Sequence, residues 1–308
     1  MSWIMIITSK IKSVFNKYIS QGYWYNEVQF RDCAKFWKYN SFNTEVINLG
    51  STAGVKAFCY ENVPLACANW ALSANPLSGY LAILKNYYSY LCEKGATVII
   101  PLCPFTSLAG SYRIDEDRYY TILYPSSIPS YSIRRDNIIR NIKDNPFHSY
   151  PVSAIHKDIY MRLIGRKSVR LTEEQMIKDS ELWMANWMKE FSIIDFSYPL
   201  SMVNIDGIED ALVLLNELIF YCKERGLRPA ILIPPVYHTL GQKFTPEIRK
   251  ILIDSLIDRI EDKSVWFHNY MDDNSFSTDI TLFENSFFLN KKGSMLFTNR
   301  VLKDLGLL

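Results

Sequence analysis

The sequence predicts an α/β fold in which a parallel sheet lies between two layers of helices. Three observations support this prediction. Short apolar runs of strand length recur along the chain, segments with helical spacing of apolar residues alternate with them, and a glycine follows several of the helical segments. Buried parallel strands need cover on both faces, so a three-layer αβα sandwich is expected.

Five segments predict the strands. In chain order they are residues 45–49, residues 64–70, "ATVIIPLC" (96–103), "PAILIPP" (229–235) and "SVWFHNY" (264–270). Because helical segments alternate with them and crossovers are right-handed, we expect a parallel sheet of about five strands in flavodoxin-like order.

Apolar residues at helical spacing predict the main helices. They cover residues 78–94, ending at Gly95 as a C-cap, and then residues 208–225, 245–262 and 290–305. The alternation stops between about residues 106 and 201, which we interpret as a long insertion or cap within a single domain, 1–308. Thr172 and Gln175 form a capping box for a helix in this insertion that reaches about Phe191.

The N-terminal residues, up to about Tyr18, predict an amphipathic helix with Trp3, Ile7, Ile11 and Phe15 on one face. The apolar run is shorter than the roughly 20 residues that span a bilayer. No transmembrane segment is expected, and docking on the body of the protein is favoured over resting on a membrane.

Composition narrows the classes of function. A formal net charge of +2 over 308 residues gives no global reason for nucleic-acid binding. The six cysteines and four histidines are dispersed without metal-ligand spacing, so neither a metal nor a cofactor is expected. Cysteines in apolar contexts indicate reduced thiols and a cytoplasmic location.

Ligands of open α/β sheets bind beyond the carboxyl ends of the strands. In "VINLGSTAG" a strand delivers Ser51 to this edge. The local sequence leaves two interpretations open: a small turn or N-cap residue, or a catalytic nucleophile. The same edge should hold Cys103, His238 and Glu284. His238 and Glu284 could act as bases, but a loop histidine bonded to backbone and a solvated surface carboxylate are the favoured interpretations. Cys103 is expected to be a structural thiol.

The order of "NLGS", "NWALSA" and "NSFFLNKKG" resembles the SGNH or GDSL-type hydrolases. It is closest to the branch resembling D-alanine transfer proteins and SGNH-like proteins of cell-envelope polysaccharide loci. The resemblance implies Ser51 as the nucleophile and Ala74 as a backbone oxyanion donor in place of glycine. It also implies that Asn285 and Phe288 stand at the positions of the family's Asp and His. The substrate-binding candidates at the cleft are Gly50, Asn69, Ser73 and Thr106.

Departures from the family pattern bear on chemistry. Phe288 cannot accept a proton, Asn285 carries no charge, and "CPFTS" has no asparagine to serve as the third oxyanion donor. We therefore expect a catalytically impaired SGNH-like protein that binds a carbohydrate or acylated glycan at Ser51. The alternatives are an active esterase or acyltransferase on carbohydrate esters with a non-standard base, and an unrelated flavodoxin-like binding protein.

The segment 134–170 is rich in Arg and Lys and contains several tyrosines. Arg134 and Arg135 are candidate contacts to an anionic glycan, because guanidinium groups bind such oxygens bidentately. A solvated basic face is the alternative interpretation.

Overall fold

The computed structural model describes residues 3–37, 42–109, 116–165 and 170–308, and the side chains from residue 10 onward. The chain divides into two compact units. Unit 1 combines Met1–Asn40 with Ile114–Ser168, and unit 2 combines Ser41–Arg113 with Val169–Leu308. The expected insertion is thus shared: its middle folds with the N-terminal residues, and its two ends belong to unit 2.

Unit 2 contains the predicted parallel sheet. Its five strands lie in the order β2-β1-β3-β4-β5, and every neighbouring pair is parallel. This confirms the α/β fold with flavodoxin-like strand order. The strands are β1 (Val46–Asn48), β2 (Cys67–Asn69), β3 (Thr97–Pro101), β4 (Arg228–Ile233) and β5 (Trp266–Asn269).

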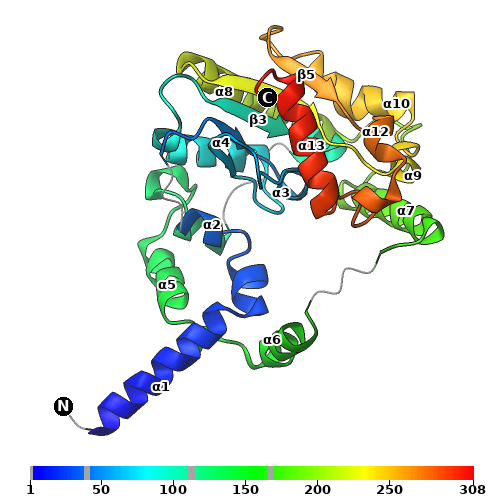
Figure 1. Cartoon of the computed structure of the whole chain (residues 1–308). Helices are drawn as coiled ribbons and strands as arrows, with labels where there is room; N and C mark the ends of the chain where they lie inside the picture. The colour runs from blue at the N-terminus through cyan, green and yellow to red at the C-terminus, as the bar shows by residue number, and fades with distance from the viewer. Residues whose placement is uncertain (1–2, 38–41, 110–115, 166–169) are drawn as a thin grey trace. The chain divides into compact units, whose positions relative to one another are not determined.

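Helices cover both faces of this sheet, as Figure 1 shows. On one face α3 (Thr52–Ala57) packs against α13 (Lys291–Asp304), and on the other α4 (Leu77–Tyr87) packs against α8 (Met202–Glu224). The α13 face holds an apolar core that includes Val46, Ile99, Leu232 and Phe297. The central strands are buried on both sides, which explains why they read as continuous apolar runs in the sequence.

Side-chain caps fix the starts of two long helices of unit 2. Thr172 and Gln175 form the predicted capping box of α7 (Glu173–Glu190). The side chain of Asn290 caps α13 by accepting from the Gly293 amide. Unit 2 also contains the short α-helices α9 (His238–Gly241), α10 (Pro246–Arg249), α11 (Ser255–Ile257) and α12 (Asn274–Ser277).

Two helix predictions need correction. The helix after Ser78 ends at Tyr87 and continues only as a 3-10 turn, so Gly95 does not cap it. Gly95 instead forms the turn before β3 with φ +96°, where a side chain would meet the Gly226 carbonyl. The helix predicted over 245–262 is interrupted by a π-helical turn, Lys250–Asp254, between α10 and α11.

Unit 1 is helical in its described part. It contains α1 (Trp3–Ser20), a π-helical turn (Trp24–Gln29), α2 (Ala34–Trp37), α5 (Ile133–Asp144) and α6 (Val152–Ile164). The carboxylate of Asp158 is fully buried, and it accepts hydrogen bonds from the Trp24 amide at 2.7 Å and the Tyr150 hydroxyl at 2.8 Å. These bonds tie α6 to the residues that follow α1.

The predicted N-terminal helix is confirmed as α1, and two members of its predicted apolar face are partly exposed. Ile11 is 51% exposed and Phe15 is 47% exposed. The side chains of Trp3 and Ile7, the other members of that face, lie outside the described residues, as do residues 166–169 of the basic segment. In the described chain, no helix combines the length and the apolar character needed to cross a bilayer.

Candidate functional site

The loop after β1 is a tight turn built from two glycines. Gly50 has φ +136°, and a Cβ there would lie 2.9 Å from the Cα of Gly54. A Cβ on Gly54 would lie 2.7 Å from the Leu49 carbonyl oxygen. Ser51 follows at the N-cap of α3 but makes no side-chain capping bond. Its hydroxyl has no hydrogen-bond partner in the described part of the chain, so no base activates it there.

Asn69, a candidate substrate contact, instead braces this loop. Its amide nitrogen lies 3.2–3.3 Å from the carbonyl oxygens of Gly54, Val55 and Phe58. Its Oδ1 accepts from the Ala71 amide and from Nδ2 of Asn48, each at 3.0 Å. Because α3 is short, its last carbonyls have no helical partners, and the Asn69 amide donates to them instead. The polar atoms of Asn69 are therefore all bonded within the protein.

The segment after β2 runs beside the Ser51 loop. The Leu72 amide donates to the Gly50 carbonyl at 3.0 Å, and Ser73 is buried. Ala74 has φ +52°, a left-handed conformation that favours glycine. The chain thus keeps the backbone conformation of a glycine at the position where the family resemblance implies one. However, the Ala74 amide donates to Oγ1 of Thr52 at 3.1 Å, so this N–H is already paired.

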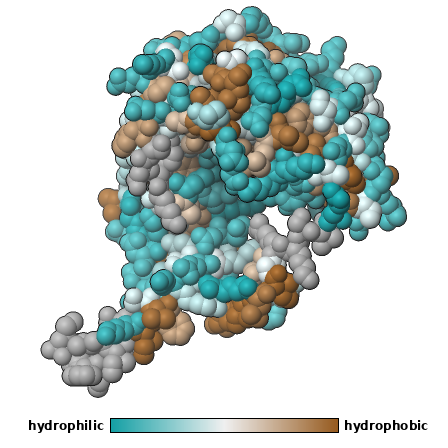
Figure 2. All heavy atoms as spheres, viewed as in Figure 1, coloured by the Kyte–Doolittle hydropathy of each residue, from teal (hydrophilic) through white to brown (hydrophobic). Residues whose placement is uncertain are grey.

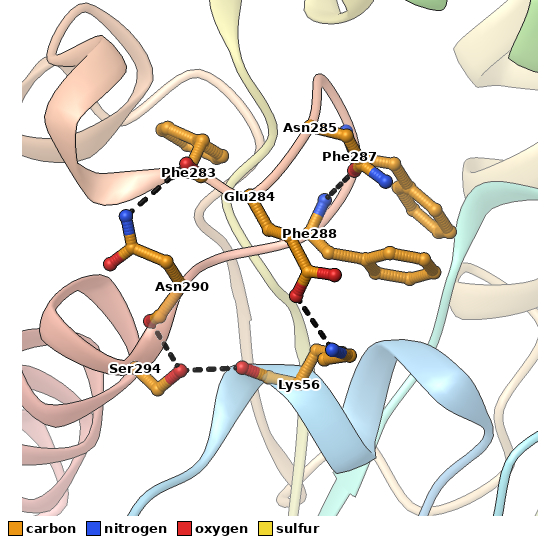
Figure 3. A network of polar contacts seen from close by, with 8 residues as sticks. All are labelled: Lys56, Phe283, Glu284, Asn285, Phe287, Phe288, Asn290 and Ser294. Atoms are coloured by element: carbon orange, nitrogen blue, oxygen red, sulfur yellow. Dashed lines mark hydrogen bonds and ion pairs between the residues drawn. The ribbon is translucent and has the colours of Figure 1, made fainter. Parts of the chain in front are cut away.

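Asn285 and Phe288, which the family resemblance aligns with Asp and His, lie on the loop before α13. Figure 3 shows the polar contacts around them. Oδ1 of Asn285 accepts from the backbone amides of Phe287 at 3.0 Å and Phe288 at 2.8 Å, which closes a local turn. Glu284 forms an ion pair with Lys56 of α3 at 2.6 Å, and its side chain is 47% exposed. The Asn285 oxygen that would orient a base is thus committed to the backbone.

Aromatic side chains from α7 fill the space at the strand ends. The ring of Trp183 packs edge-on against that of Phe288, with ring centroids 5.4 Å apart. The ring centroid of Trp187 lies 4.8 Å from that of Phe287 and 4.9 Å from that of Phe105. Phe288 itself is only 9% exposed. The two tryptophans are spaced i, i+4 on a helix predicted from the sequence, which was the signal that they share one face.

Phe287 and Phe288 border a cavity of only ≈ 10 Å³ at the carboxyl ends of the strands. Its walls come from Ala53, Lys56, Ala57, Leu102, Cys103, Pro104, Ile233, Pro234, Pro235, Val236, Phe287, Phe288 and Leu289. A cavity of this size holds about one water molecule. Ligand sites are usually about 300–1,000 Å³, so no sugar ring fits this cavity as it stands.

The other candidate bases are engaged elsewhere. Nε2 of His238 lies 3.3 Å from Oε1 of Glu173, and the second carboxylate oxygen of Glu173 accepts from the Tyr237 hydroxyl.

Burial raises the pKa of the Cys103 thiol above its ordinary value. Thr106 accepts from the Cys103 amide at 2.9 Å and lies 3.3 Å from its sulfur, so both residues brace the turn after β3.

The basic candidates lie in a different part of the molecule. Arg134 and Arg135 belong to α5 in unit 1, whereas Ser51 belongs to unit 2. Nε of Arg135 pairs with Asp117 at 2.8 Å, and its guanidinium lies over the ring of Tyr120. Arg134 is exposed. Arg135 is therefore already paired within its own unit.

A larger opening lies beyond the ends of β4 and β5, and the sequence reasoning missed it. We call it the β5 hollow. It measures ≈ 740 Å³, and its lining residues are His238, Gly241, Gln242, Phe244, Thr245, Pro246, Arg249, Asp254, Asn269, Asp272, Asn274 and Ser277. The signal was available, since two of these residues, Asn269 and Asp272, stand at or just after the carboxyl end of β5.

Bonds of the Arg249 side chain hold one wall of the β5 hollow in place. Arg249 forms an ion pair with Asp272 and donates to the carbonyls of Phe244 at 2.6 Å and Gly241 at 3.0 Å. By contrast, the side chains of Gln242, Asp254 and Asn274 are exposed and make no hydrogen bond with other described residues. Amide and carboxylate groups thus face an open space on a braced scaffold.

No three His, Cys, Asp or Glu side chains come together in a metal-binding cluster within the described ranges. Comparison of the chain with protein-family models and with curated proteins gave no match. The site must therefore be interpreted from its own geometry.

Proposed function

We propose that unit 2 is an SGNH-like unit that does not hydrolyse esters at Ser51 and that the chain acts by binding a carbohydrate or acylated glycan. The observation that carries the first part is the environment of Phe288. An imidazole is needed at that position in the family, and the chain has instead a phenyl ring packed against Trp183.

The remaining groups at the site support the same proposal. General-base catalysis contributes roughly 10²–10⁴-fold, and one oxyanion donor about 10²–10³-fold. The hydroxyl of Ser51 has no base among the described residues, and the Ala74 amide is paired with Thr52. Both contributions are therefore reduced at the same site.

The β5 hollow is the better seat for a ligand than the small cavity at Phe288. Its volume lies in the range of small-molecule sites. Sugar hydroxyls both donate and accept hydrogen bonds, which suits the amides of Gln242 and Asn274 and the carboxylate of Asp254. Because Arg249 is occupied by Asp272 and two carbonyls, the hollow favours a neutral, hydroxyl-rich part of a glycan.

The catalytic part is tested by turnover and by covalent labelling. The natural protein should hydrolyse small acyl esters no faster than Ser51→Ala, and a fluorophosphonate should leave Ser51 unlabelled, because the probe needs an activated hydroxyl. Turnover that Ser51→Ala abolishes would contradict the proposal and favour the active-esterase alternative, with His238 or Glu284 as base. Asn285→Asp combined with Phe288→His then asks whether restoring the family residues creates Ser51-dependent activity.

The binding part is tested separately with a panel of neutral and anionic oligosaccharides, by array and then by calorimetry. The double variant Gln242→Ala, Asn274→Ala removes two exposed side chains that hold no part of the fold. It should weaken binding about tenfold, since two hydrogen bonds are each worth about 0.5–1.5 kcal/mol. Asn299→Ala, an exposed amide on α13, is the matched control. Equal binding by the double variant and the control would exclude the β5 hollow as the seat.

A further inference from the structure

Helix α1 carries an exposed apolar stripe along its described side chains. The stripe consists of Ile11, Val14, Phe15 and Tyr18, which are 51%, 68%, 47% and 41% exposed. Their spacing, i, i+3, i+4 and i+7, places them on one face of the helix. Such a stripe normally packs against a core, so its exposure calls for a partner.

Helix α6 carries a second exposed stripe. Val152, Ile155, Ile159 and Leu163 are 82%, 41%, 45% and 80% exposed. Their spacing of three, four and four residues again defines one face. A neighbouring face of α6 holds the buried Asp158, so the helix is anchored to unit 1 by that residue while the apolar stripe stays uncovered.

The two stripes belong to one packed assembly within unit 1. The guanidinium of Arg162 on α6 lies 3.7 Å from the ring centroid of Tyr18 on α1 and donates to the Tyr18 carbonyl. Phe15 contacts the ring of Phe147, which is itself 44% exposed. Figure 2 shows hydrophobic surface over the described end of α1 and along α6.

The charge around these stripes has one sign. Lys10 and Lys17 on α1, and Lys157 and Arg162 on α6, are exposed, and the only acidic residue in either helix is the buried Asp158. Unit 1 contains 15 Lys and Arg against eight Asp and Glu, a formal charge of +7. Unit 2 contains 19 against 24, a formal charge of −5. The net charge of the whole chain is therefore close to zero although unit 1 is strongly basic.

We propose that α1 and α6 form a docking surface for an anionic lipid membrane, on which the two stripes enter the headgroup region. Apolar faces flanked by Lys and Arg are the signature of helices that lie in a membrane interface, and each basic residue near an anionic surface contributes about 1 kcal/mol. Tyr18 and Tyr160 add rings that prefer the interface. A second copy of the chain is disfavoured as the occupant, because pairing these faces would bring two units of charge +7 together.

The test uses the full chain and sedimentation with vesicles of phosphatidylcholine alone or mixed with phosphatidylglycerol. The protein should bind the anionic vesicles. Binding should weaken in the double variant Lys10→Gln, Lys17→Gln, and it should also weaken as the salt concentration rises, because salt screens the charges. The variant Val14→Ser, Leu163→Ser should lower the partition coefficient about tenfold or more, since each lost apolar side chain weakens insertion. Both sites are exposed, so the variant should fold.

The matched control is Val213→Ser, Phe220→Ser, which removes two side chains of α8 that are 65% and 62% exposed on the acidic unit. It should bind vesicles as the natural protein does. Three results would overturn the proposal: no binding to anionic vesicles, equal loss in the stripe variant and the control, or a natural protein that is dimeric and becomes monomeric only in the stripe variant. Because no glycan or ester takes part, these outcomes are independent of the proposed function.

Discussion

Replacing Asn69 tests whether this residue braces the fold or awaits a ligand. Asn69→Ala removes the amide that serves the Gly54, Val55 and Phe58 carbonyls and the oxygen that serves Asn48 and Ala71. The amide shares two protons among three carbonyls, so these bonds count for less than five separate ones. At about 0.5–1.5 kcal/mol each, the loss should be about 3 kcal/mol in the free energy of unfolding.

Differential scanning calorimetry measures this loss. At about 2–4 °C per kcal/mol for a unit of this size, the transition of unit 2 should fall by about 6–12 °C, while that of unit 1 stays in place. Asn69→Asp keeps the shape but removes the donor and sets a carboxylate against three carbonyl oxygens, so it should cost more than Asn69→Ala at pH 7. Asn299→Ala should change stability by no more than about 0.5 kcal/mol. An Asn69→Ala protein as stable as that control would refute the bracing role and return Asn69 to the list of ligand contacts.

Two further predictions concern other buried groups. Asp158→Ala should destabilise unit 1 by about 3 kcal/mol in calorimetry, because it removes two charge-assisted hydrogen bonds. Gly22→Ala should act in the same direction, since its Cβ would clash with Oδ2 of Asp158. Unchanged unfolding of unit 1 in both variants would exclude this anchor. Burial raises the pKa of the Cys103 thiol, so at pH 8 the reactive thiolate is scarcer than in the unfolded chain, and iodoacetamide should alkylate Cys103 far more slowly in the native protein, as followed by peptide mass spectrometry. Native and unfolded chains that react at one rate would contradict this.

The sequence by itself determined the sheet. Apolar runs such as Val98–Ile100 and Ala230–Ile233 are buried on both sides, and that environment leaves a continuous signal that is local in the chain. The same holds for the start of α7, where the Thr172 capping box depends only on residues that are close in the chain. The turn that carries Ser51 could also be predicted from the sequence, because the backbone at Gly50 and Gly54 leaves no room for a side chain.

Only the tertiary structure decided which side chains cover the strand ends and which brace the Ser51 loop. Trp183 packs against Phe288, and Asn69 donates to the Phe58 carbonyl, and no local sequence pattern encodes either contact. The pairing of the N-terminal residues with residues 114–168 likewise involves a buried carboxylate, Asp158, which looks in the sequence like any helical acid. Periodicity reports which face of an element is buried. It does not report which distant side chain covers that face, and for α1 and α6 the structure shows apolar faces that remain exposed.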